Sequence, residues 1–554
     1  MKRGWLFLLM LTVALIALPP TWYPTAVRIQ LSAWFGATAF RALPESSPSE
    51  VPDVEVFCQP DLQGWRRSHH IEGVSIAASK PCVADNPYLV AAFVRGTNNI
   101  SRETLLKSGL TLDAVEKDQD LDGDGDPDVI HIRLEIAELN GASTESDRAV
   151  TQFAIAPGIN PGLWVFAPKL AGMARENFES VMARTALRLP SPAIRVEQGD
   201  QIVLTLENTH YMPHTLHLHG ADHGFTTSDG GGNDGVPLTS EVPVLPGGSR
   251  SYELTPRTSG TMFYHCHVQP QVHVSMGLQG LFIIEENRPD NWLQTMNIGA
   301  GFVRAPSVAV RESFSQEYDL QYSDIDKQLN ERIQQAVDPR IVTRLMHRDY
   351  DVTDSSVDYF VLNGRSFPYT FRESILVTEP DELIKLRVLN AGRNGIAWHT
   401  HGHKYTITAK NGTVVPASAR APQDVAWLAT SERMEVSLST KNDGLNSYGA
   451  GIWLFHDHRN RGVTSNGIGP GGNISAIVYD EYLDSDGWPK TQNMAFDPYF
   501  TEAYYRRDIP VWQSYAPELF SDPASDWLML ARVAVLCLAV GGMIALMFSF
   551  LRFR

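Results

Sequence analysis

Cysteine is scarce in this chain: its 554 residues contain only four. Cys537 lies in an apolar segment near the C-terminus, and we predict that Cys58 and Cys82 pair outside the cytoplasm, where disulfides persist. Cys266 is then left without a disulfide partner. Its thiolate is therefore available for other chemistry.

Positive charge is also in short supply, with 46 Lys and Arg against 63 Asp and Glu and a formal net charge of −17. This balance argues against nucleic-acid binding, which needs a basic face, and it fits a secreted surface. The chain is 43% hydrophobic and 20% charged, which is typical of a globular protein. Its length predicts two or more domains.

Long uncharged apolar runs are confined to the two ends. Lys2 and Arg3 precede an apolar run, so residues 1–40 are predicted to be a signal sequence or an N-terminal membrane anchor. Near the other end, 533–551 carries no charge and is long enough to span a bilayer, which predicts a transmembrane helix over 527–551. The arginines after it place the tail 552–554 in the cytoplasm and all preceding residues outside, in the periplasm or at the cell surface.

An acidic stretch, "DQDLDGDGDPD", precedes the first long strand pattern. Asp120, Asp122 and Asp124 have the spacing of a calcium loop, and Asp128 falls at its ninth position. The twelfth position is His131 rather than Glu, and a strand pattern follows, so this is not an EF-hand. Two interpretations stay open: a calcium loop of another kind, and a solvated acidic turn.

The middle of the chain is predicted to be all-β and internally duplicated. The hairpin-like pair 193–208 and the strand 280–286 recur in the same order as 375–390 and 473–483, with histidine clusters at equivalent places. We therefore expect two β-sandwich domains, with a helical insertion early in the second. The predicted segments are an N-terminal β-rich extension at 41–126, domain 1 at 127–287, a connection at 288–304, domain 2 at 305–483 and a linker to the membrane at 484–526.

Histidines occur in pairs far more often than chance allows. Seventeen histidines placed at random would give about half of one H-x-H pair in a chain of this length. Residues two apart on a strand project to the same face, so each pair offers two imidazoles to one metal site. The observed pairs are His217/His219, His265/His267, His399/His401, His401/His403 and His456/His458.

Cys266 narrows the choice of metal, because two imidazoles and one thiolate with a weak fourth group are the blue-copper ligand set. His273 follows in "HCHVQPQVH", and His214 begins "HTLHLHG". Leu278 takes the axial place, where it would not bond to copper, and Met276 is the alternative.

These motifs, together with "HTHG" and "FHDH", resemble those of multicopper oxidases, the laccase-like cupredoxin enzymes. The resemblance covers 127–483 and implies two cupredoxin-like Greek-key domains and four coppers per functional site. It implies type 1 copper at His214, Cys266 and His273, and type 2 copper at His217 and His399. It implies the type 3 pair at His219, His265, His267, His401, His456 and His458.

The implied activity is four-electron reduction of O2 to water, with electrons from a phenol, a metal ion or an electron-transfer protein. Asp222 and Asp457 lie beside the motifs and are candidates for proton relays, or else ordinary loop acids. The spacing from Cys266 to His273 resembles that in copper nitrite reductases, so nitrite reduction is the alternative function. A non-enzymatic copper-binding protein is the second alternative. Because two-domain relatives share each cluster between neighbouring subunits, we expect a homotrimer.

Overall fold

The computed structural model separates into two compact units, 53–491 and the two termini 1–52 with 492–554. Each unit is described by itself. The residues whose structure is described are 69–71, 74–76, 114–141, 153–169, 188–289, 293, 295–297, 301–304, 314–335, 339–485, 487–491, 497–508 and 523–551.

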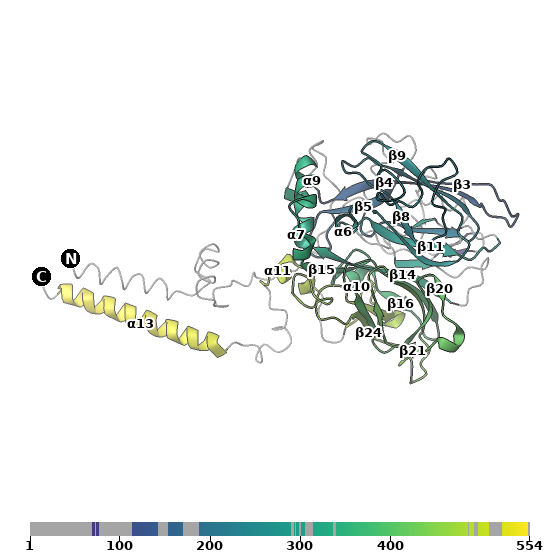
Figure 1. Ribbon diagram of the computed structural model, residues 1–554. Helices are drawn as coiled ribbons and strands as arrows, with labels where there is room; N and C mark the ends of the chain where they lie inside the picture. The colour runs from purple at the N-terminus through teal and green to yellow at the C-terminus, as the bar shows by residue number, and fades with distance from the viewer. Residues whose placement is uncertain are drawn as a thin grey trace. The chain divides into compact units, whose positions relative to one another are not determined.

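Domain 1 consists of two β-sheets (Figure 1). One sheet has the order β12-β6-β11-β10-β8, and the other has the order β3-β4-β7-β9 with β5 paired to β4. The strands are β3 (Val115–Asp118), β4 (Val129–Leu139), β5 (Leu163–Pro168), β6 (Ala193–Glu197), β7 (Gln201–Glu207), β8 (His217–His219), β9 (Ser249–Leu254), β10 (Gly260–His265), β11 (Gln279–Glu285) and β12 (Met296–Asn297), with the short helix α6 (Pro270–His273) after β10.

Domain 2 repeats this plan. One sheet has the order β16-β25-β24-β18-β22; the other has the order β13-β14-β17-β23-β19-β20, with β15 on β14 and β21 on β19. The strands are β13 (Gly301–Arg304), β14 (Gln316–Asp326), β15 (Val357–Leu362), β16 (Leu376–Thr378), β17 (Leu383–Asn390), β18 (Ile396–Thr400), β19 (Tyr405–Lys410), β20 (Thr413–Val414), β21 (Pro422–Gln423), β22 (Val425–Leu428), β23 (Arg433–Ser439), β24 (Ile452–Asp457) and β25 (Ser475–Tyr479). Short helices are α10 (Tyr369–Glu373), η4 (Val352–Asp354), η5 (Ala417–Ala419) and η6 (Asp480–Tyr482).

The pairing of strands shows the duplication directly. β6 pairs in parallel with β11 in domain 1, and β16 pairs in parallel with β25 in domain 2. The expected hairpin of 193–208 was wrong, because β6 and β7 lie in different sheets, as do β16 and β17. The chain crosses between sheets at Gly199, whose φ of +103° suits glycine, while Asp200 accepts a hydrogen bond from the Glu197 amide.

Burial along the strands explains the two layers. β7 alternates between buried and partly exposed residues, as expected for a strand with one face on the core. β10 and β11 are buried throughout, because domain 2 covers their outer face. β3 and β12 pair with domain 1 strands and lie outside the range 127–287 predicted for domain 1.

Apolar contacts and buried ion pairs join the two domains. Phe263 and Ile283 of domain 1 share a buried cluster with Leu389 of domain 2. Beside them, the Arg195 guanidinium lies 2.5 Å from the Asp319 carboxylate, and both side chains are fully buried. The domains therefore form one packed body rather than two loosely tethered ones.

The predicted helical insertion consists of α7 (Lys327–Asn330), α8 (Arg332–Gln335) and α9 (Pro339–His347). It belongs to domain 2 by sequence, but Leu329, Val342 and Met346 are buried in the core of domain 1. Figure 1 shows α7 and α9 along the edge of domain 1.

Outside the sandwiches, β1 (His69–Ile71) pairs with β2 (Val74–Ile76). The terminal unit contains η7 (Asp497–Phe500), α11 (Glu502–Tyr505) and α13 (Pro523–Leu551). Within the part of the chain that the structure describes, no helix is both long and apolar enough to cross a membrane. Cys58, Cys82 and the predicted N-terminal segment 1–40 lie outside the described residues.

Candidate metal centre

His214, Cys266 and His273 meet in the interior of domain 1, and all three are fully buried. Cys266 follows β10, His273 ends α6, and His214 is held by reciprocal backbone hydrogen bonds with Val244. The Cys266 Sγ lies 3.6 Å from Nδ1 of His214 and 3.3 Å from Nδ1 of His273. Three donor atoms therefore converge on one point, as the blue-copper prediction requires.

The chemistry of these three groups fits a soft cation. Burial raises the pKa of the Cys266 thiol to about 12 and lowers the pKa values of His214 and His273 well below their usual range. Neutral imidazoles are the form that binds metal, whereas a buried thiolate needs a cation to stabilise it. A thiolate and two imidazoles are donors that copper prefers.

Leu278 and Met276 are both fully buried beside this cluster. The Leu278 carbonyl accepts a hydrogen bond from the Cys266 amide at 3.1 Å, and the Met276 carbonyl accepts one from the Trp164 amide at 2.8 Å. Backbone contacts therefore fix both residues, and the axial role of Leu278 stays a prediction.

His210 and Glu138 belong to none of the motifs, yet both adjoin the buried cluster. Nδ1 of His210 lies 2.9 Å from Nε2 of His214, and Nε2 of His210 lies 3.3 Å from Oε1 of Glu138. The same carboxylate oxygen accepts hydrogen bonds from Nε1 of Trp164, at 3.0 Å, and from the Tyr211 hydroxyl. A series of hydrogen bonds thus orients His214, running through His210 to the carboxylate of Glu138.

A second histidine group lies on the other side of Cys266. β8 and β10 pair so that His217 is opposite His265, which brings the side chains of His217, His219 and His265 together. Nε2 of His219 and Nε2 of His265 are 3.1 Å apart. The ring of His267 lies 5.1 Å from that of His217. We call these four histidines the domain 1 half-cluster.

Domain 2 repeats the arrangement. β18 and β24 pair with His399 opposite His456, and Nε2 of His401 lies 3.2 Å from Nε2 of His456. The ring of His458 lies 5.2 Å from that of His399. These four form the domain 2 half-cluster. Two nitrogens bound to one ion at about 2.0 Å would be separated by roughly 3.3 Å in tetrahedral geometry, so both half-clusters have the spacing of a metal site.

Backbone carbonyls set the direction of the imidazoles in both half-clusters. In each case Nδ1 is the bonded nitrogen, so it carries the proton and Nε2 is left as a free donor to metal. The Nδ1 contacts are His217 to Asp234 O at 2.6 Å, His399 to Asp424 O at 2.9 Å, His265 to Cys266 O at 2.9 Å and His456 to Asp457 O at 3.0 Å. The fit to copper is therefore as good for these groups as for the buried cluster.

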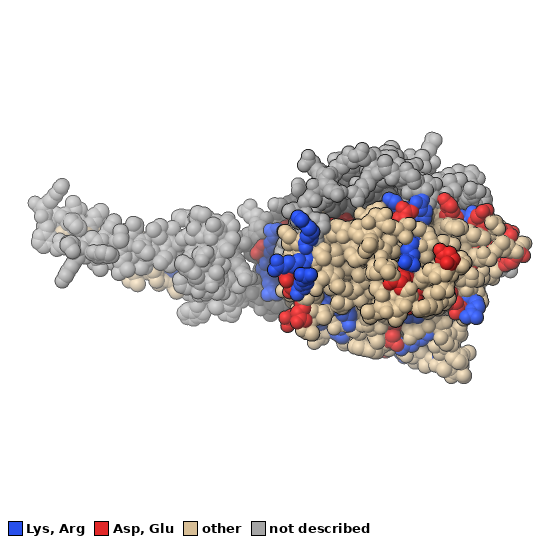
Figure 2. Space-filling view, turned by 45° about the horizontal axis from the view of Figure 1, so that its top comes forward, with Lys and Arg blue, Asp and Glu red and all other residues tan. Residues whose placement is uncertain are grey.

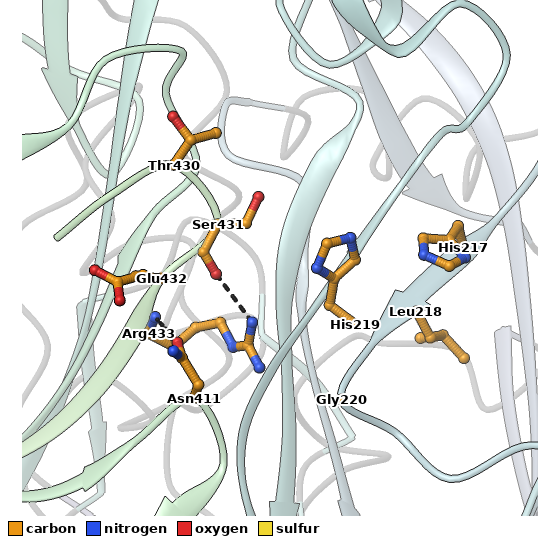
Figure 3. A pocket seen from close by; sticks show the side chains of 9 residues that line it. All are labelled: His217, Leu218, His219, Gly220, Asn411, Thr430, Ser431, Glu432 and Arg433. Atoms are coloured by element: carbon orange, nitrogen blue, oxygen red, sulfur yellow. Dashed lines mark hydrogen bonds between the residues drawn. The ribbon is translucent and has the colours of Figure 1, made fainter.

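The two half-clusters of one chain do not meet. Among the described residues, the histidines near one another form one set from domain 1 and another from domain 2. Figure 3 shows what lies opposite His217 and His219 instead: a pocket of about 520 Å³ whose far wall comes from domain 2. Its residues are His217, Leu218, His219, Gly220, Asn411, Thr430, Ser431, Glu432 and Arg433.

Arg433 is the cation of this pocket and was not singled out from the sequence. It donates hydrogen bonds to the carbonyl oxygens of Ser431, at 2.9 Å, and Thr261, at 3.2 Å. Burial, followed by the charges of His217 and Arg433, lowers the pKa of His219 to about 4. The pocket therefore favours the neutral, metal-binding form of this histidine.

The predicted proton relays lie in ion pairs with arginines. Asp222 accepts a hydrogen bond from the Arg257 amide at 3.0 Å and also pairs with the exposed Arg257 guanidinium. Asp457 is fully buried, and its carboxylate lies 2.7 Å from Nη2 of Arg459. Relay roles for both acids stay predictions.

In the acidic stretch, Asp120, Asp122 and Asp128 have carboxylate oxygens within 4.8 Å of one another. Some of these carboxylate oxygens already accept hydrogen bonds within the loop: Asp120 accepts one from the Gly123 amide at 2.6 Å, and Asp128 accepts one from the Asp122 amide at 3.2 Å. The calcium loop, with Asp124 as a further ligand, and the solvated turn both stay open.

Comparison with known proteins supports one family. A family model described as multicopper oxidase matches 176–289, the segment that contains the buried cluster and the domain 1 half-cluster. Over residues 176–289 the chain is therefore similar to multicopper oxidases.

Two curated proteins illustrate the similarity. Oxidoreductase OpS5 of Beauveria bassiana is 31% identical over 127 residues, which are 23% of this chain and 20% of that protein. The iron transport multicopper oxidase FET3 of Candida glabrata is 24% identical over 281 residues, 49% of this chain and 38% of that protein. The chain therefore matches well under half the length of either relative.

Two solved structures superpose on part of this chain. The multicopper oxidase mgLAC superposes with a TM-score of 0.47 at 23% identity, covering 68% of this chain and 94% of that chain. The blue copper oxidase of Nitrosomonas europaea superposes with a TM-score of 0.44 at 22% identity, covering 71% and 94%.

Proposed function

We propose that the protein is a copper oxidase that takes single electrons from a donor and reduces O2 to water. The observation that carries this proposal is the position of Cys266, whose thiol faces the buried cluster while His265 and His267 belong to the domain 1 half-cluster. Copper, when bound to these residues, supplies one-electron redox chemistry and the reduction of O2. Only a few covalent bonds separate the two groups of ligands.

The protein residues orient this chemistry. His214, Cys266 and His273 form a dry site, and two further imidazole sets keep Nε2 free for metal. Their number favours an oxidase over a copper nitrite reductase, which needs one type 2 copper held by three histidines. A copper-storage protein would not need a buried thiolate site adjoining the half-clusters.

Each complete site is proposed to lie between two chains of a homotrimer. One chain has a half-cluster on each domain, and the domain 1 half-cluster faces Arg433 rather than His399 and His401. A ring of three chains would bring each domain 1 half-cluster against the domain 2 half-cluster of a neighbour. The assembled site would then hold type 2 copper between His217 and His399, and the type 3 pair among the other six histidines.

Complementation tests the ring. A chain with His399→Ala and His401→Ala is assembled together with a chain carrying His217→Ala and His219→Ala. Each variant alone should be inactive, while mixed rings should regain part of the O2 uptake at the interfaces that pair two intact half-clusters. Full activity of a strictly monomeric wild-type chain would refute the shared site.

The reaction itself is tested by copper content, blue absorption and a choice of acceptor. We expect four coppers per chain and O2 consumption with a phenol, Fe(II) or a reduced electron-transfer protein. Nitrite reduction without O2 uptake would support the nitrite reductase alternative, and tight copper binding without turnover of any donor would support the non-enzymatic one.

The location is part of the proposal. The charge pattern around 527–551 supports an extracytoplasmic catalytic part, in the periplasm or at the cell surface, with a membrane anchor. Fractionation of cells before and after proteolytic removal of the C-terminal segment tests it: the catalytic part should be released from the membrane fraction. Calcium binding at Asp120, Asp122, Asp124 and Asp128 is tested separately by calorimetry.

A further inference from the structure

The helix α9 covers the buried type 1 cluster. Its last residue, His347, places its ring 5.4 Å from that of His273, nearly at a right angle. Val342 and Met346, on the same helix, are buried in the core of domain 1, and the Thr343 hydroxyl lies 3.0 Å from the Met212 sulfur. The helix α9 therefore packs against the His273 side of the cluster.

The rings of His273 and His347 are in edge contact, and each ring has one nitrogen without a hydrogen-bond partner among the described residues. Nε2 of His273 and Nε2 of His347 are both buried and lack a hydrogen-bond partner among the described residues. Buried polar atoms are normally hydrogen-bonded, so two such nitrogens without a partner in neighbouring rings are unusual. His273 is fully buried while His347 is only partly so, which makes His347 the link between the cluster and the surface.

The outer side of α9 is basic. Arg340 and Arg344 lie four residues apart on one face of α9, and Arg348 follows directly after the helix, where its amide donates to the Arg344 carbonyl at 3.0 Å; all three are exposed. The Arg344 side chain is 72% exposed, with Asp349 3.3 Å away. Lys and Arg side chains gather at the edge of the molecule where α9 lies (Figures 1 and 2). In a chain with a net charge of −17, such a stripe is a local reversal of sign.

We infer that this stripe docks a small electron-transfer protein with an acidic patch, and that His347 is the contact through which its electron reaches His273. The inference rests on the proposed oxidase function and names the class of its donor. One electron leaves the reduced centre of the donor, which is oxidised, and reduces the type 1 site; no bond forms or breaks and no proton moves. Complementary charge suits such brief complexes because it speeds association.

A lipid surface fits less well. Each basic residue adds only about 1 kcal/mol of attraction to an anionic membrane, so three arginines bind weakly. The acids Asp349, Asp351 and Asp354 follow directly in the sequence and confine the basic area to α9. Lipid binding would also leave unexplained the unpaired Nε2 atoms of His273 and His347.

Binding is measured first, without turnover, between the oxidised copper-loaded protein and an oxidised acidic c-type cytochrome. The variant Arg344→Glu/Arg348→Glu should weaken the complex about tenfold or more at low ionic strength, and salt should erase the difference. The matched control, Arg420→Glu/Lys441→Glu, makes the same charge change at exposed positions of domain 2 and should leave the affinity unchanged. A basic cytochrome should bind poorly to the wild type.

Electron transfer is measured second. His347→Leu should leave the affinity and the blue absorption unchanged and slow the first-order electron transfer in the complex about tenfold or more. The arginine variant should show the opposite signature, with weaker binding and an unchanged first-order rate. An unchanged rate in His347→Leu would remove His347 from the path.

Failure of docking and failure of the oxidase proposal give different results. If a neutral phenol supports O2 uptake but the acidic cytochrome binds no better than the basic one, the docking inference is wrong and the oxidase stands. If the arginine variant loses cytochrome binding but no donor supports O2 uptake, docking stands and the oxidase is wrong. If the arginine variant keeps cytochrome binding but no longer binds phosphatidylglycerol vesicles, the stripe binds lipid and the inference is wrong. If the variant keeps cytochrome binding but no longer forms the oligomer, the stripe contacts a second copy and the inference is wrong.

Discussion

Nε2 of His214 lies 2.9 Å from Nδ1 of His210, and this contact decides which nitrogen of His214 is free. His210 donates a hydrogen bond from Nε2 to Glu138, so its Nδ1 accepts a hydrogen bond from Nε2–H of His214. Nδ1 of His214 is then unprotonated where it faces Cys266. Burial opposes ionisation of Glu138, but hydrogen bonds from His210 and Tyr211 outweigh it and keep the pKa of this carboxyl below its usual value.

Glu138→Leu should therefore weaken copper binding at the buried cluster by about 10- to 100-fold, the usual effect of losing a group that orients a metal ligand. Glu138→Gln keeps an acceptor oxygen and should have a smaller effect. Copper titration followed by the blue absorption measures both. Glu135→Gln, on the same strand β4 but bonded to Lys169 and Thr209, is the control, and an equal loss there would remove the special role of Glu138.

Cys266→Ser should abolish the blue absorption and the oxidase activity while most of the fold remains, because the thiolate–copper bond produces that band. Circular dichroism checks the fold, and visible absorption checks the site. Cys537→Ser changes the exposed free cysteine of α13 and should keep the colour. A blue Cys266→Ser protein would contradict the assignment.

Leu278→Met should lower the reduction potential of the type 1 site, because a thioether would then approach the copper axially. Redox titration of the blue band measures the shift. Met276→Leu is the matched change at the neighbouring buried position and should leave the potential unchanged. The reverse pattern would move the axial role to Met276.

Arg387→Met should destabilise the domain interface strongly. Arg387 is buried and pairs with Glu285 across the interface at 3.0 Å, with Glu435 at 2.6 Å and with Glu317. Removing the cation leaves buried carboxylates uncompensated, which costs about 3–5 kcal/mol. Denaturant unfolding measures the loss. Lys410→Met breaks a more exposed ion pair with Glu432 and should lower the free energy of unfolding by less than about 1 kcal/mol. Equal losses in the two variants would show that the buried interface pairs contribute no more than an exposed pair.

The all-β class and the duplicated plan were predictable because H-x-H pairs and alternating strands are local patterns with a fixed period. The groups that the sequence singled out do meet: Cys266 with His214 and His273, and each half-cluster within its own domain. The β6–β7 pair was wrong because a hairpin and a crossing between sheets have similar local sequence.

What the sequence could not supply are contacts between distant residues. Glu138 reaches His210 across 72 positions, and His347 approaches His273 only because an insertion of domain 2 packs on domain 1. No sequence motif or fixed spacing between these residues indicates either contact. Arg433 is similar, because its place beside His219 depends on how the two domains pack.

A last prediction concerns acid stability, through Glu373 at the end of α10. This carboxyl is buried and contacts three arginines: Arg188 at 2.7 Å, Arg365 at 3.1 Å and Arg372. Burial alone would raise its pKa, but the charges of Arg365, Arg188 and Arg372 outweigh burial and lower the pKa from 4.5 to about 2. The folded state thus holds the ionised form more strongly than the unfolded chain does.

Because the folded pKa is the lower one, the stabilisation from Glu373 is complete above about pH 4.5 and is lost as the pH falls towards 2. Glu373→Gln should therefore be less stable than the wild type at neutral pH, and the difference should shrink as the pH falls through that window. Denaturant unfolding of both proteins at a series of pH values measures it. Glu481→Gln, at an exposed position of domain 2, should leave the curve unchanged. A constant difference between wild type and Glu373→Gln down to pH 2 would show that packing, rather than charge, gives Glu373 its role.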